Sequence, residues 1–156
     1  MAPRWLGILV SSDKIVAVDA EVPKTGLLKL VADHSWSLQE GERATAYAIM
    51  HQQVSDYVSE HGIKRVVVKE SAVSLGGTKK AHLQAAELRG IVIAAAASKT
   101  RTEVISKAHI SRTFGSRKVD EYLSDSNFWT AELEGKSLRV GSREAAMVLL
   151  AARKEK

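Results

Sequence analysis

Cysteine is absent from the 156 residues, which excludes disulfide bonds, thiolate-bound zinc and a cysteine nucleophile. Aromatic residues make up only 5% of the chain, so a core has to rest on Val, Ile, Leu and Ala. No apolar run approaches the roughly 20 residues of a membrane span, and the one that follows Arg4 is too short for a secretory signal. We therefore expect a soluble cytoplasmic protein without a membrane partner.

The composition is otherwise that of one globular domain covering residues 1–156. Hydrophobic residues account for 45% and charged residues for 26% of the chain, which argues against extensive disorder. The formal net charge is +5. A basic balance favours polyanionic partners, because lysine and arginine neutralise phosphates and release counterions.

Three short apolar runs open the chain, at residues 5–10, 15–22 and 27–38. The polar turns at 11–14 and 23–26 separate them. Short turns between β-branched runs predict an antiparallel meander of three strands.

The periodicity then changes to that of helices alternating with strands. Apolar residues at three- and four-residue steps predict an amphipathic helix at 40–60, with a core-facing stripe formed by Ala44, Ala48, His51, Val54 and Val58. The remaining expected elements are strands at 63–68 and 103–105, helices at 79–97 and 142–154, and two short helices within 107–125 that Gly115 separates.

Three local expectations accompany these elements. Residues 91–97 are apolar nearly all round and should be buried, and Gly90 before them suggests a close backbone contact. Ser142 is a candidate N-cap of the last helix, whereas residues 128–138 give no readable pattern. The resulting order, βββ-α-β-α-β-α, predicts an α/β fold with a five-stranded mixed sheet covered by helices on both faces.

Five segments, taken in order, resemble RuvC-type Holliday-junction resolvases of the ribonuclease-H-like superfamily. Residues 6–12 (LGILVSS) resemble the first strand of that family, and residues 66–70 (VVVKE) its fourth strand, which ends in a catalytic Glu. Residues 80–96 resemble the family's long helix with its internal Arg-Gly pair. Residues 103–118 resemble its fifth strand and the basic segment after it, and residues 141–147 (GSREAAM) resemble its last helix.

The resemblance implies a two-metal nuclease site, in which carboxylates hold two Mg²⁺ or Mn²⁺ ions about 4 Å apart. Glu70 and Glu144 stand at two of the positions that are catalytic and metal-ligating in the family. Leu9 occupies the central-strand position where an Asp normally stands, and Gly141 replaces another frequent acid. A third acid would have to come from Asp13 or Asp19, so the site looks degenerate.

Each glutamate also has an ordinary structural explanation. Glu70 fits a strand-end carboxylate that is paired with Lys69 or Lys80, and Glu144 fits a first-turn acid favoured by the helix dipole. The five histidines lack metal-ligand spacing. Only His109, within the basic segment, is a candidate phosphate contact.

Two groups of basic residues are candidates for nucleic-acid binding. By resemblance, Lys79 and Lys80 follow a loop that approaches the junction, with Val73 or Leu75 as an apolar wedge. The second group comprises Lys99, Arg101, Lys107, Arg112, Arg117 and Lys118. Trp36, Phe128 and Trp129 are expected to pack in the core or at its edge.

Three functions fit the sequence. We favour a DNA-binding protein related to these resolvases, with reduced or lost nuclease activity, acting on branched or structured DNA. The alternatives are an active Mg²⁺-dependent endonuclease, and a protein–protein regulatory module that uses the apolar second helix or the region of Phe128 and Trp129. Family members commonly dimerise, so a homodimer is compatible with all three.

Overall fold

The computed structural model describes residues 2–70 and 79–154 and contains a mixed sheet of six strands in the order β5-β4-β1-β2-β3-β6. The strands are β1 (Arg4–Val10), β2 (Lys14–Glu21), β3 (Leu28–Ser37), β4 (Arg65–Lys69), β5 (Arg101–Ile105) and β6 (Leu133–Gly135). The first three form the antiparallel meander, and β4 and β5 extend it in parallel. The expected meander and mixed sheet are confirmed.

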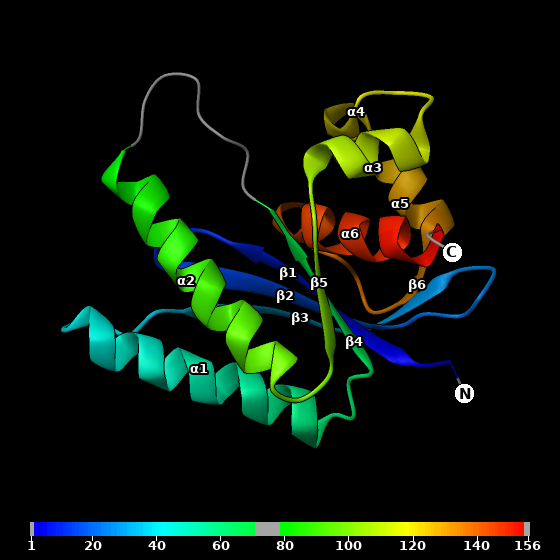
Figure 1. Ribbon diagram of the computed structural model, residues 1–156. Coiled ribbons are helices and arrows are strands. Elements are labelled where there is room, and N and C mark those ends of the chain that lie inside the picture. The colour runs from blue at the N-terminus through cyan, green and yellow to red at the C-terminus, as the bar shows by residue number, and fades with distance from the viewer. Residues whose placement is uncertain (1, 71–78, 155–156) are drawn as a thin grey trace.

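Helices cover both faces of the sheet (Figure 1). On one face lie α1 (Arg43–Glu60) and α2 (Lys80–Ala97); on the other lie α3 (Lys107–Phe114), α4 (Val119–Leu123), α5 (Ser126–Glu132) and, after the 3-10 turn Val140–Ser142, α6 (Arg143–Lys154). Among the described residues, no helix has both the length and the apolarity to cross a membrane.

Successive side chains of the central strands point to opposite faces of the sheet and belong to two separate cores. Leu6, Ile8 and Val10 of β1 pack toward α1 and α2, while Leu9 packs toward α6. In β4, Val66 and Val68 face α1 and α2, whereas Val67 faces α6. The two-sided burial explains why the Val66, Val67 and Val68 run shows no polar alternation in the sequence.

The sequence predicted five strands, and β6 is the additional, sixth strand. It pairs in parallel with β3 over three residues, Leu28 to Leu30 opposite Leu133 to Gly135. A strand this short, with Glu134 and Gly135 in it, carries too little periodicity to be recognised.

Three helical expectations need correction. The buried stripe of α1 contains Ala46 and Met50, together with Val54 and Val58, so the assignment of Ala44, Ala48 and His51 was wrong. The stripe with the larger side chain, Met50, is the one that the sheet covers, because it buries more apolar surface.

The second and third corrections concern α2 and α6. Ala94 and Ala97 are exposed, and nothing lies within 4 Å of a Cβ placed at Gly90, so α2 is neither fully buried nor tightly packed there. The hydroxyl of Ser142 does not act as the expected cap. It donates to Asp33 Oδ1 at 2.6 Å and so ties the start of α6 to β3.

A close glycine contact does occur at Gly7, in β1. A Cβ atom there would overlap the backbone carbonyl of Ala145 in α6, so the absence of a side chain lets the helix lie directly on the strand. This contact fixes where the first turn of α6, which carries Glu144, meets the sheet.

We predict that Gly7→Ala destabilises the protein by about 1–3 kcal/mol, because backbone and helix must separate to admit the methyl group. The matched control is Gly90→Ala, which we expect to stabilise by about 1 kcal/mol, since an exposed helical glycine gains helix propensity without a clash. Urea denaturation measures both. Equal effects of the two substitutions would contradict this account of the packing.

Candidate functional site

The predicted metal position lies where β1 and β4 end beneath the first turn of α6. The two strands are in parallel register, with Ile8 opposite Val68, so the next residues along, Leu9 and Lys69, are neighbours. Leu9 is partly buried against the α6 core. Lys69, the last residue of β4, shares that face because Val67, two residues earlier, does.

The structure gives Glu144 a partner that the sequence did not favour. Lys69 Nζ lies 2.7 Å from Glu144 Oε1, and the two side chains are 12% and 28% exposed. At this distance and burial, the contact is a charge-assisted hydrogen bond, which is stronger than a neutral one. Glu144 also lies in the first turn of α6, where the helix dipole favours a negative charge.

Glu70 is not brought to Glu144 by any described contact. Its N–H donates to Ile105 O at 2.8 Å, which continues the ladder between β4 and β5, and the residue is exposed. Strand alternation that places Lys69 on the α6 face turns Glu70 to the opposite face. The assignment of Glu70 and Glu144 as catalytic metal ligands therefore stays a prediction that this register does not favour.

Asp19 does not supply the third acid. It is fully buried on the α1 face, where it accepts hydrogen bonds from Arg4 and from the Tyr57 hydroxyl. Burial, together with the hydrogen bond to Asp19, raises the pKa of Tyr57 well above its usual value. Asp13 lies exposed in the turn after β1, and its carbonyl accepts from Leu38 N.

The residues at this position do not fit a two-metal centre. Such a centre requires several hard oxygen ligands that converge on the ions. Here one carboxylate, Glu144, already pairs with an ammonium group beside the apolar Leu9. Within residues 2–70 and 79–154, no three acidic or histidine side chains group in a way that could hold a metal ion.

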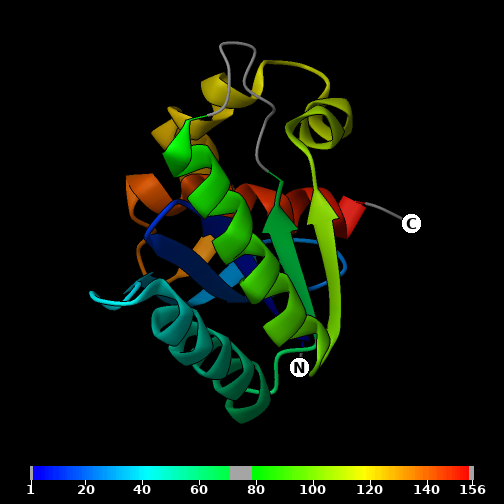
Figure 2. The ribbon, with the colours of Figure 1, turned by 60° about the vertical axis from the view of Figure 1, so that its left-hand side comes forward.

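The candidate DNA contacts divide between two ends of the molecule. We define the basic end as the end toward which β4 and β5 point, where the start of α2 and the helices α3 and α4 lie (Figure 2). It carries Lys79, Lys80, Lys107, Arg112, Arg117 and Lys118. Val73 and Leu75 lie outside the described residues.

Lys99 and Arg101 were wrongly grouped with these residues. Arg101 begins β5 and Lys99 lies just before it, whereas Lys107 begins α3 after the same strand ends. The full length of β5 therefore separates the two parts of the predicted cluster (Figure 2).

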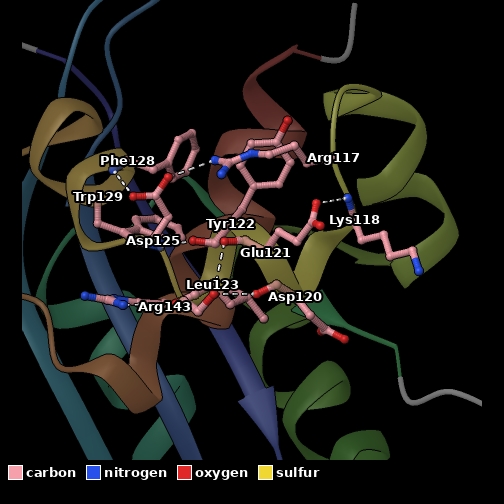
Figure 3. A network of polar contacts seen from close by, with 11 residues as sticks. Arg117, Lys118, Asp120, Glu121, Tyr122, Leu123, Asp125, Phe128, Trp129 and Arg143 are labelled. Carbon is pink, nitrogen blue, oxygen red and sulfur yellow. Dashed lines mark hydrogen bonds and ion pairs between the residues drawn. The ribbon is translucent and has the colours of Figure 1, made fainter.

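Acidic neighbours partly neutralise the basic end. Lys107 lies 3.4 Å from Asp120, and Arg117 lies 3.1 Å from Asp125 while also stacking over the Tyr122 ring (Figure 3). A hydrogen bond from Phe128 N and the Arg117 guanidinium lower the pKa of Asp125. Ion pairs this accessible to solvent are weak, so phosphates can replace their acidic partners.

His109 lies next to this region, in α3. With Arg112, Thr113 and Lys154 it lines a shallow pocket of about 360 Å³. The side chain of Lys154 also stacks over the Phe114 ring, 4.6 Å from its centroid. The basic surface therefore continues from α3 to the end of α6.

The aromatic residues pack as expected. Trp129 is 4% exposed and donates from Nε1 to Tyr122 O, and Phe128 packs edge-on against it. Trp36 stacks on His34 at the edge of the other core. Because Trp129 is buried, the region of Phe128 and Trp129 offers no exposed tryptophan for a partner protein.

The sequence matches no family model. No curated protein matches it either.

Solved structures do match, among them two of RuvC and one of a mitochondrial Holliday junction resolvase. RuvC of Thermus thermophilus in complex with a Holliday junction substrate superposes with a TM-score of 0.73 at 12% identity, covering 97% of this chain and 93% of that one. A second Thermus thermophilus RuvC structure gives 0.72 at 14% identity, covering 96% and 93%. The yeast mitochondrial Holliday junction resolvase gives 0.66 at 10% identity, covering 98% and 80%.

Identities this low establish the fold alone. The similarity nevertheless spans nearly the whole chain, including the meander, the parallel strands and the closing helix. The chain has the ribonuclease-H-like fold of the RuvC type.

Proposed function

We propose that this protein binds branched or structured DNA through the basic end and that it does not cleave the DNA. The observation that supports the first part is the collection of six basic residues at one end of a RuvC-type fold. One solved structure of similar fold is that of Thermus thermophilus RuvC in complex with a Holliday junction substrate. Phosphate neutralisation supplies most of the affinity of such surfaces.

The Lys69–Glu144 ion pair supports the second part of the proposal. In a two-metal nuclease, the cations neutralise clustered carboxylates, position the water nucleophile and stabilise the leaving oxygen. In this chain an ammonium group neutralises Glu144, and Leu9 has no lone pair to offer. Neither the ammonium group nor the leucine side chain can activate water. The site is therefore charge-balanced but has no group for phosphodiester hydrolysis.

An active Mg²⁺- or Mn²⁺-dependent endonuclease remains the alternative that the ion pair opposes. It would require the Lys69 side chain to withdraw and Glu70 to reach the α6 face. A protein–protein module is favoured less, because Trp129 is buried and the basic residues would then have no role. Homodimer formation and a cytoplasmic location stay predictions.

We predict that DNA binding is strongly salt-dependent and that charge reversal at the start of α2 weakens it. Lys79→Glu combined with Lys80→Glu should weaken binding of a labelled four-way junction by about tenfold or more and flatten the slope of log K against log salt between about 50 and 200 mM. Fluorescence anisotropy measures both quantities.

The matched control reverses two exposed lysines far from the basic end, Lys24→Glu with Lys64→Glu, for the same change in net charge. We expect it to reduce affinity far less. Equal losses in the two double variants would show that only net charge matters, and a wild-type affinity that does not vary with salt would contradict DNA binding.

A second prediction tests the loss of the metal site. Leu9→Asp combined with Lys69→Glu should bring two new carboxylates beside Glu144, and we expect this variant to bind Mn²⁺ where the wild type does not, because hard oxygen ligands then converge. Isothermal titration calorimetry and the Mn²⁺ electron paramagnetic resonance signal report binding.

Lys64→Glu, the same lysine-to-glutamate change just before the opposite end of β4, is the control and should bind no Mn²⁺. Stoichiometric Mn²⁺ binding to the wild type would contradict the reasoning, and so would a double variant that folds but binds no more Mn²⁺ than the control.

A further inference from the structure

A cavity of about 310 Å³ lies between α5, β6 and the start of α6. It belongs to the stretch, residues 128–138, whose role the sequence left open. The lining side chains that carry the argument are Ser126, Trp129, Thr130, Lys136, Ser137 and Arg143. Neither the basic end nor the Lys69–Glu144 pair contributes to this lining.

The unusual member of the lining is Arg143, which is only 9% exposed. Its Nη1 donates to Leu123 O at 3.0 Å and its Nη2 to Ser126 Oγ at 3.1 Å. Its Nε is buried and has no hydrogen-bond partner. Figure 3 shows the guanidinium beside Leu123, away from the Asp125–Arg117 pair.

Both partners of Arg143 are neutral, and no carboxylate in the described part of the chain pairs with it. A guanidinium carries five N–H donors and cannot lose its charge in a protein. Buried charges are normally paired, because leaving water is costly without a counter-ion. A buried guanidinium with only neutral partners in the wall of a cavity favours an anionic ligand in that cavity.

The rest of the lining matches a phosphate group in particular. Ser126 and Ser137 provide hydroxyl donors, and Lys136 adds an exposed ammonium group at the rim. An arginine side chain can donate two parallel N–H hydrogen bonds to phosphate oxygens, and hydroxyl groups can donate to the oxygen lone pairs that remain. Glu134, the acid of the lining, is exposed and is free to turn into solvent.

We propose that this cavity binds a phosphate monoester, with Arg143 and Lys136 holding the phosphate oxygens. The volume exceeds what an inorganic phosphate needs, so part of the esterified group is also enclosed. The phosphate can come from the 5′ end of a nucleic-acid strand or from a free nucleoside monophosphate. The site is separate from DNA binding at the basic end and stands without it.

The main test supplies the missing counter-ion from the protein. Ser126→Asp places a carboxylate where Arg143 already donates, in the first turn of α5, which also favours an acid. We expect this variant to melt at a higher temperature than the wild type and to lose phosphate binding. The wild type should gain thermal stability in inorganic phosphate, compared with sodium chloride of the same ionic strength.

The matched control is Asn127→Asp, the same charge change one residue later on the same helix turn. Asn127 is exposed and does not line the cavity, so this variant should keep the full response to phosphate. A third variant, Lys136→Ala, leaves the buried structure untouched and should weaken phosphate binding by about tenfold, the cost of one charge-assisted hydrogen bond.

The two sources of phosphate are then distinguished by calorimetry. Adenosine monophosphate that binds more tightly than inorganic phosphate indicates a free nucleotide. A short oligonucleotide that binds better with a 5′-phosphate than without one, and loses that advantage in Ser126→Asp, indicates a strand end. Either result supports the site.

Three results would overturn it: a wild type that responds equally to phosphate and chloride, a Ser126→Asp variant that keeps the response, or an Asn127→Asp variant that loses it. Reversal of Lys79 and Lys80 should leave the phosphate response intact. Failure of DNA binding is therefore recognised separately from failure of this site.

Discussion

The close approach of α6 to β1 decides what kind of site this fold carries. Gly7 leaves room for the carbonyl of Ala145, so the first turn of α6 lies directly over the ends of the central strands. Glu144 consequently meets the residue that β4 presents on that face, which is Lys69. With a carboxylate at that register the same backbone would gather acids for metal ions; with a lysine it forms an ion pair.

The Lys69–Glu144 pair balances the charge of Glu144 without a metal ion. A carboxylate cluster is unstable without cations, because like charges at close range repel one another. With Lys69 and the apolar Leu9 beside Glu144, neither that repulsion nor a need for cations arises. The fold and the basic end do not depend on this ion pair, since neither the two cores nor the surface lysines include it.

Most of the fold was predictable because its elements are locally encoded: apolar runs between polar turns predict the meander, and three- and four-residue spacing predicts α1, although it misplaced part of the buried stripe of α1. The site was less predictable. Val66, Val67 and Val68 are buried on both sides, so nothing local indicates whether Lys69 or Glu70 faces α6. Ser142 bonds Asp33 across 109 positions of the sequence, and Arg143 meets its neutral partners, Leu123 and Ser126, only because α4 and α5 fold back against α6. Neither set of contacts leaves a local pattern.

The most direct measurement is incubation of the wild-type protein with a labelled four-way junction in Mg²⁺ and in Mn²⁺, following both the bound complex and any cleaved product. This account predicts a complex that forms at low salt and no product with either metal beyond the metal-only control. Product that appears with the wild type and disappears with Glu144→Gln would contradict it, because Glu144 would then serve a metal-dependent reaction and not an ion pair.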